Sequence, residues 1–132
     1  NTEAVREGLL ECMWEDVGIA RDAAGMNRAL DRLAALDAEL DRTGIDGAAR
    51  EYNVSWHDWL NLKNLIAVSR VITVAALARE NSRGAHFRED FPDAGDFAGS
   101  TYTVVRQSGA AIDVAHEPVR FTRLQPGQSL TG

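Results

Sequence analysis

Several residue types that mark whole classes of protein are scarce in this chain of 132 residues. A single cysteine, Cys12, excludes an internal disulfide, so nothing in the sequence points to an oxidising compartment. No apolar run approaches the roughly 20 residues that cross a bilayer. The first residues, Asn1 to Glu3, lack the basic and apolar regions of a signal peptide. We therefore expect one domain that is held together by its apolar core.

Positive charge is also in short supply. Lys and Arg number 14 against 20 Asp and Glu, which gives a formal net charge of −6. An acidic chain repels phosphate groups, so we expect no binding of nucleic acid or of anionic membranes. Lys63 is the single lysine. Arginine favours planar pairing with carboxylates, although a codon bias would explain the excess of arginine equally well.

Three segments with helical spacing of apolar residues fill the first part of the chain. The first covers about 2–16 with Thr2 as N-cap, and its apolar stripe predicts that Cys12 is buried and inert. The second covers about 24–42 and ends before Gly44, which fits a left-handed C-terminal glycine.

The third segment, 56–81, has the strongest helical pattern. Ser55 is the expected N-cap, with Asp58 completing a variant of the capping box. Apolar residues lie nearly all round this helix, which predicts a central position with contacts on several sides. At 26 residues it would measure about 39 Å. That length suggests that one end projects or packs on something outside this chain.

The pattern changes after Gly84. Residues 100–106 and 111–116 have strand-like composition and flank a turn at 107–110, which predicts a hairpin, and 119–124 is a further extended candidate. The predicted fold is mainly α: a spectrin-repeat-like, up-down-up three-helix bundle over residues 1–92. A connector and β-hairpin tail over 93–132 follow, packed on the bundle or on a partner because an isolated hairpin is marginally stable.

The densest polar cluster lies where the third helix should end, at 79–92. Part of it has a structural interpretation, since Gly84 could cap the helix and His86 and Arg88 could bind its last carbonyls. Three arginines, one histidine and three acids within twelve residues exceed what a cap requires. A docking role and a plain helix terminus therefore remain alternatives.

The sequence contains no self-contained active site. His57 and His116 lie far from each other and from Cys12 in the chain, and no CxxC or HExxH spacing is present. The glycine motifs of nucleotide-binding loops and the GxSxG motif are also absent. We expect no catalytic, cofactor-binding or metal-binding residue in this chain.

The segment Arg79 to Pro92 resembles the R-x-E-S-R-G-A-H-x-R-x-D-F-P segment of succinate dehydrogenase and fumarate reductase flavoprotein subunits. The resemblance extends to 11–21, to the L-x-L-x-N-L stretch at 60–65, and to the terminal hairpin. This sequence departs from the pattern at Asn81, where the family has Glu, and at 94–101, where the family has charged residues and a tryptophan. These departures suggest a divergent member of the family.

The resemblance implies a C-terminal helical domain of a larger FAD-dependent oxidoreductase, in which hydride passes between FAD and a C4 dicarboxylate. The FAD-binding and catalytic residues would lie outside this chain, which alone should be inactive and hold no cofactor. The implied partners are the flavin-binding domain of the same chain and an iron–sulfur subunit. The implied location is cytoplasmic, either free or peripheral on the inner face of the cytoplasmic membrane. The residues expected to dock on the flavin domain are Arg79, Ser82, Arg83, Gly84, His86, Arg88 and Asp90.

Two alternatives stay open. L-aspartate oxidase, a sister flavoenzyme, shares the S-R-G-x-H signature but typically lacks the hairpin, and a free-standing helical interaction module would have no enzymatic parent. If the domain evolved to dock, the isolated chain should expose an apolar or arginine-rich patch near 79–92 and could form a homodimer through it.

Overall fold

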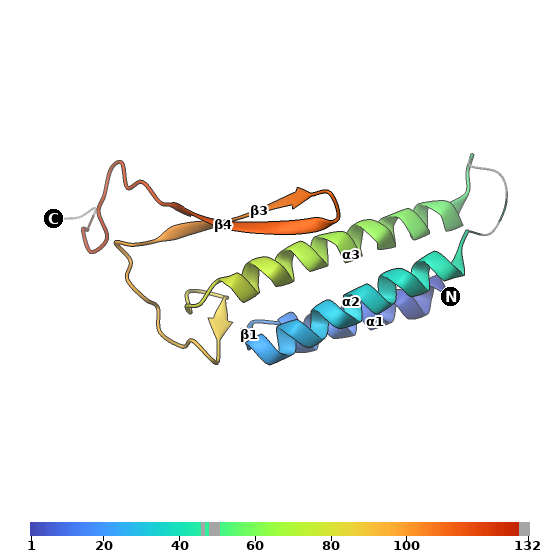
Figure 1. Ribbon diagram of the computed structural model, residues 1–132, viewed down its shortest axis with the longest axis horizontal. Coiled ribbons are helices and arrows are strands. Elements are labelled where there is room, and N and C mark those ends of the chain that lie inside the picture. Colours follow the sequence, from blue (N-terminus) through green and yellow to red (C-terminus); the bar gives the residue numbers. More distant parts are fainter. Residues whose placement is uncertain (46, 48–50, 130–132) are drawn as a thin grey trace.

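The structure is a computed structural model that describes residues 1–45, 47 and 51–129. Three helices, two very short strands and a hairpin follow one another: α1 Thr2–Val17, β1 Ala20–Arg21, α2 Ala23–Thr43, α3 Val54–Ala78, β2 Phe87–Arg88, β3 Thr101–Ser108 and β4 Ala111–Pro118. Figure 1 shows α3 between two layers, with α1 and α2 on one side and the β3–β4 hairpin on the other. The predicted three helices and antiparallel hairpin are confirmed.

The helix caps differ in part from those predicted. α1 is capped by Asn1, whose side chain accepts from the N–H of Glu3, so Thr2 already belongs to the helix. α3 is capped by Asn53, whose Oδ1 accepts from the N–H of Trp56 at 3.0 Å. Ser and Asn are equally good caps, so the sequence alone did not discriminate between Asn53 and the predicted Ser55. Gly44 ends α2 as predicted and has a positive φ of +67°, but its ψ of −165° lies outside the left-handed helical conformation that was expected.

The core lies mainly along the contact between α1 and α2. It contains Val5, Leu9, Cys12, Ala29, Leu33, Leu36 and Leu40, with Leu62 and Ile66 added by α3. Gly8 allows the two helices to approach closely, because a Cβ there would come within 3.2 Å of a Leu36 methyl group. Cys12 is buried as predicted, and burial raises the pKa of its thiol.

α3 is less enclosed than predicted. It buries one stripe, Leu62, Ile66, Ser69, Thr73 and Ala76, and leaves several large apolar side chains exposed. Its attachment to α2 includes polar contacts. Trp59 Nε1 donates to the carbonyl of Leu40 at 3.0 Å, and Lys63 Nζ donates to Asp37 and Asp41 at 2.6 and 2.9 Å.

The helix Val54–Ala78 is also long and apolar enough to cross a membrane. Its most apolar 18-residue stretch has a mean hydropathy of 1.4, and 28 % of that stretch is buried inside the structure. The sequence-based exclusion of such a segment was therefore too strict. It relied on uninterrupted apolar runs, whereas this helix tolerates Lys63 and Arg70 among apolar residues. A core helix of a water-soluble protein meets the same criterion.

The hairpin lies along α3. Its strands pair antiparallel from Thr101↔Pro118 to Ser108↔Ala111, and Gly109 takes the left-handed conformation in the turn with φ at +62°. Val105 and Ile112 line a groove with Val68 and Val71 of α3. Within the described residues 119–124 add no third strand, and Val119 N–H donates to Ser100 O at 2.9 Å beside the open end of the hairpin.

Candidate docking site at the end of α3

After α3 the chain folds back and ties the end of this helix to the α1–α2 connection. β2 pairs in parallel with β1, with Ala20 opposite Phe87 and Arg21 opposite Arg88. Phe87 N–H donates to Ile19 O at 3.1 Å, and Glu89 N–H donates to Arg21 O at 2.9 Å. Sequence reasoning missed this pairing, because two-residue strands carry no periodic signal.

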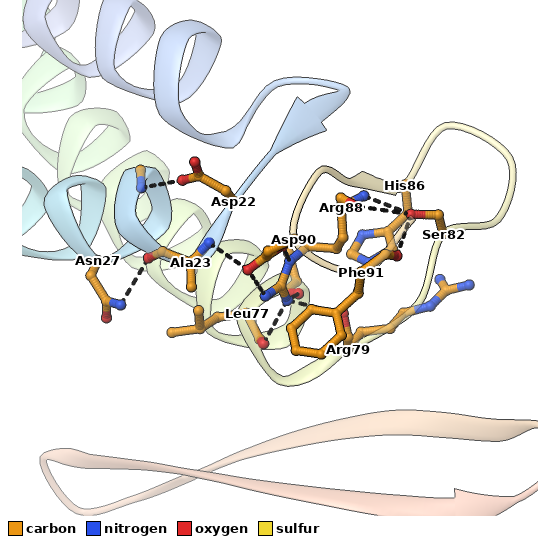
Figure 2. A network of polar contacts seen from close by, with 12 residues as sticks. Asp22, Ala23, Asn27, Leu77, Arg79, Ser82, His86, Arg88, Asp90 and Phe91 are labelled. Carbon is orange, nitrogen blue, oxygen red and sulfur yellow. Dashed lines mark hydrogen bonds and ion pairs between the residues drawn. The ribbon is translucent and has the colours of Figure 1, made fainter. Parts of the chain in front are cut away.

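Arg88 lies at the centre of this region (Figure 2) and its side chain is 1 % exposed. Its Nη1 donates to the carbonyls of Ala76, Leu77 and Arg79 at 3.2, 2.9 and 3.1 Å. These carbonyls belong to the last turn of α3, where backbone acceptors lack helical partners and a cation is favoured. The prediction that Arg88 binds the last carbonyls is therefore confirmed.

Asp90 completes this arrangement. Its carboxylate accepts from Arg88 Nε and Nη2 at 2.7 Å each, and from the N–H of Ala23 at the start of α2 at 3.0 Å. The Arg88 hydrogen bonds, with a smaller effect from the Ala23 N–H, lower the pKa of Asp90 to about 2. One ion pair thus joins the negative end of α3 to the positive end of α2.

Ser82 and Gly84 shape the loop. Ser82 Oγ accepts from the N–H of Arg88 at 2.8 Å and donates to Phe91 O at 2.8 Å. Gly84 has φ at +57° in a tight turn closed by two backbone hydrogen bonds between Arg83 and His86. The prediction that Gly84 caps the third helix at about Asn81 is wrong. α3 ends at Ala78 with Arg79 as its cap. Arg88 donates to the carbonyls that would accept from backbone N–H groups if the helix continued.

Arg83 holds the connector to the hairpin. Its Nε donates to Ala94 O at 2.6 Å, its Nη2 to Asp96 O at 3.0 Å and its Nη1 to Ser100 Oγ at 2.8 Å. The guanidinium also lies over the ring of Phe97, 4.4 Å from its centre. All three nitrogens of this side chain are therefore bonded within the chain.

His86 lies among three arginines. Its Nε2 is 3.2 Å from the carbonyl oxygen of Arg79, which can only accept, so this nitrogen carries the proton. Burial lowers the pKa of His86, and the charges of Arg79, Arg21 and Arg88 lower it further. Arg21 Nε is buried and has no hydrogen-bond partner in the described part of the chain.

All seven residues predicted to dock thus lie in one loop, but each of its three arginines donates hydrogen bonds within the chain. Two aromatic side chains of the loop, Phe87 and Phe91, are 41 and 37 % exposed, and Phe97 in the following connector is 54 % exposed. The exposed surface of the loop also carries the acidic side chains of Glu80, Glu89 and Asp90. Among the described residues no group of three or more His, Cys, Asp or Glu could hold a metal ion. The arrangement fixes the shape of this surface.

Comparison with known proteins supplies the family. Residues 6–130 match the family described as "Fumarate reductase flavoprotein C-term". The chain belongs to this family. It is 32 % identical over 129 residues to a fumarate reductase flavoprotein subunit of Mycobacterium tuberculosis, covering 97 % of this chain and 22 % of the relative. It is 33 % identical over 121 residues to a succinate dehydrogenase flavoprotein subunit of Coxiella burnetii, covering 92 and 20 % respectively.

L-aspartate oxidase is also among the relatives of this C-terminal family. The enzyme of Streptomyces coelicolor is 37 % identical over 94 residues, covering 71 % of this chain and 16 % of the relative. Among solved structures, Mycobacterium smegmatis Sdh1 in complex with UQ1 superposes with a TM-score of 0.82 at 30 % identity, covering 92 % of this chain and 21 % of that one. This chain therefore spans about a fifth of the length of the relatives that it matches.

Proposed function

We propose that this chain is the C-terminal domain of an FAD-dependent oxidoreductase of the succinate dehydrogenase/fumarate reductase type. The observation that carries the proposal is the extent of the similarity, which runs from residue 6 to residue 130 and includes the hairpin. The match to L-aspartate oxidase covers a smaller share of the chain. In this proposal the parent enzyme transfers hydride between FAD and a C4 dicarboxylate, and this chain contributes no catalytic residue.

The proposed role of this domain is to dock on the flavin-binding domain, with an iron–sulfur subunit as the further partner of the complex. Arg79, Ser82, Arg83, Gly84, His86, Arg88 and Asp90 serve this role by holding the loop in one shape. The support for it is that Arg83 and Arg88 order the loop from inside, while aromatic side chains remain exposed on it. Exposed apolar surface beside ordered polar groups is typical of interaction sites.

The proposed location follows from this assignment. The complex would lie in the cytoplasm, or peripherally on the inner face of the cytoplasmic membrane through its partner subunits. Separating the cell into soluble and membrane fractions and locating the protein by immunoblot discriminates between the two.

The experiment that tests the function uses the longer protein that contains this sequence. We expect purified material to contain FAD, to reduce fumarate with a reduced viologen dye, and to oxidise succinate with an artificial acceptor. Oxidation of L-aspartate with neither of these activities would favour the L-aspartate oxidase alternative. A protein without FAD and without all three activities would favour a free-standing interaction module.

The docking role has a separate test. In the longer protein, Arg83→Ala/His86→Ala should lower FAD retention or assembly with the iron–sulfur subunit and leave the preference among substrates unchanged. Arg106→Ala is the matched control, because Arg106 is exposed on the hairpin and its ion pair among the described residues is with the exposed Glu117. Equal FAD retention in the double variant and the control would argue against the docking role.

A further inference from the structure

Five large apolar side chains are exposed on α1 and α3. Leu10 and Trp14 of α1 are 62 and 83 % exposed, and Leu65, Val68 and Ile72 of α3 are 44, 55 and 47 % exposed. We call these five the helical apolar face. We propose that the helical apolar face is the surface on which the part of the parent chain that precedes α1 packs. The inference rests on the proposed function for its partner, and it adds a second interface on the helices, beyond the loop at 79–92.

Contacts between the helices place the two rows side by side. Arg6 and Leu10 are four residues apart on α1, and Asp58 and Leu65 are seven apart on α3, so each pair shares a helix face. The 3.7 Å contact between Arg6 and Asp58 joins the two rows near one end.

The rows are joined near the other end as well. Thr73 Oγ1 lies 3.9 Å from Met13 Sδ. Thr73 directly follows Ile72 in the sequence, and Met13 directly precedes Trp14. The five apolar side chains therefore flank the seam between α1 and α3 over several turns.

The part of this surface on α3 is free of charge. Between Leu60 and Ala78 the charged residues of α3 are Lys63 and Arg70. Lys63 turns to the carboxylates of α2, and Arg70 lines the groove towards the hairpin. A continuous exposed apolar face of this kind is unusual for a surface that stays in water.

The helical apolar face leads into a hollow of about 410 Å³ next to the candidate docking loop. Ile72, Ala75 and Tyr102 line it, together with Arg79 and His86 from the loop. Arg79 Nε is bonded to Asn81, whereas its two Nη atoms have no partner in the described part of the chain. The partner surface should therefore be apolar, with a carboxylate or another acceptor where it meets Arg79.

The chain that precedes α1 is the occupant with the best support. More than three quarters of each curated relative lies outside the matched segment, and the family is a C-terminal one. A covalently attached partner acts at a high effective concentration, so even a modest face suffices to hold it. Glu3 and Glu7 occupy the exposed side of α1 ahead of Leu10, which opposes binding to anionic lipid.

The test compares two cysteine variants of the longer protein. Leu65→Cys lies in the helical apolar face and outside the groove between α3 and the hairpin, and Ala38→Cys is the control, because Ala38 is exposed on α2 opposite the core. Each variant is treated with a thiol reagent, and the modified peptide is followed by mass spectrometry. We expect the thiol at position 65 to react at least tenfold more slowly than the thiol at position 38 in a monomeric preparation.

Other outcomes would overturn the inference. Equal rates at the two positions would show that no partner covers the face selectively. Protection that is lost when a dimer dissociates on dilution would assign the face to a second copy. Protection that requires added vesicles of anionic lipid would assign it to a membrane.

The failure of this inference can be distinguished from failure of the proposed function. Rapid reaction at position 65 in a protein that reduces fumarate would refute the interface alone. Protection in a protein without oxidoreductase activity would refute the proposed function and leave the interface standing.

Discussion

Replacement of Arg88 by methionine should destabilise the protein more than any other single charge removal on its surface or in its loops. Methionine preserves much of the side-chain volume but carries no donor. The change leaves the carbonyls of Ala76, Leu77 and Arg79 without the Nη1 donor, and it leaves Asp90 without its two guanidinium bonds. Arg88 is 1 % exposed, so its donors are lost from a buried position, whereas Asp90 is 30 % exposed and water can take over part of its bonding.

The size of the effect follows from the number and burial of these bonds. Breaking a buried ion pair by removing one partner destabilises proteins by about 3–5 kcal/mol. A typical free energy of unfolding is about 5–15 kcal/mol, so this loss is a large share of the total. For a domain of this size it corresponds to a fall in Tm of roughly 10–20 °C.

The assay is urea denaturation followed by circular dichroism, with Arg28→Met as the control. Arg28 pairs with Asp16 at 2.7 Å, but its side chain is 67 % exposed, so its removal should change the free energy of unfolding by about 1 kcal/mol or less. A loss in Arg88→Met no larger than that in Arg28→Met would refute the role assigned to Arg88.

Three further predictions concern single residues. The pKa of Asp90 is lowered to about 2, so its contribution to stability should be complete above about pH 4 and disappear between about pH 4 and 2; the difference in urea stability between the wild type and Asp90→Asn should shrink over that range. Hydrogen bonding to Asp37 raises the pKa of Lys63, so the contribution of Lys63 to the free energy of unfolding should persist up to about pH 10.5 and be lost above that pH. Lys63→Met should lower the free energy of unfolding by about 1 kcal/mol at pH 7, and the difference between this variant and the wild type should disappear above about pH 10.5. Gly84 has φ at +57°, and no atom lies within reach of an added Cβ. Gly84→Ala should therefore lower the free energy of unfolding by about 1 kcal/mol through backbone strain alone, and Gly84→Asn should lower it by less, because asparagine tolerates a positive φ better. Equal losses in the two variants would contradict an effect of backbone strain.

The parts of the fold that the sequence predicted are those with a periodic signal. The stripe from Val5 to Cys12, the glycine at the end of α2, and the alternation in 111–116 all have one, and the structure contains the corresponding elements. Helix starts were less predictable, because Asn53 and Ser55 are both good caps and only three-dimensional packing decides between them.

The end of α3 shows why the candidate site could be predicted only in part. Its composition indicated that cations meet the last carbonyls, and Arg88 does so. The parallel pairing of Ala20 with Phe87 joins segments 67 residues apart, and two-residue strands have no pattern to detect. That pairing shifts the helix end to Ala78 and moves Gly84 from the predicted cap into a turn.

The proposal that this chain is one domain of a larger flavoprotein can be tested on the native polypeptide that contains this sequence, purified from the source organism, by measuring its mass and FAD content. Since the chain spans 22 % of a relative, we expect a polypeptide roughly four to five times as long, with one FAD per chain. A native polypeptide of 14.4 kDa without flavin would contradict it.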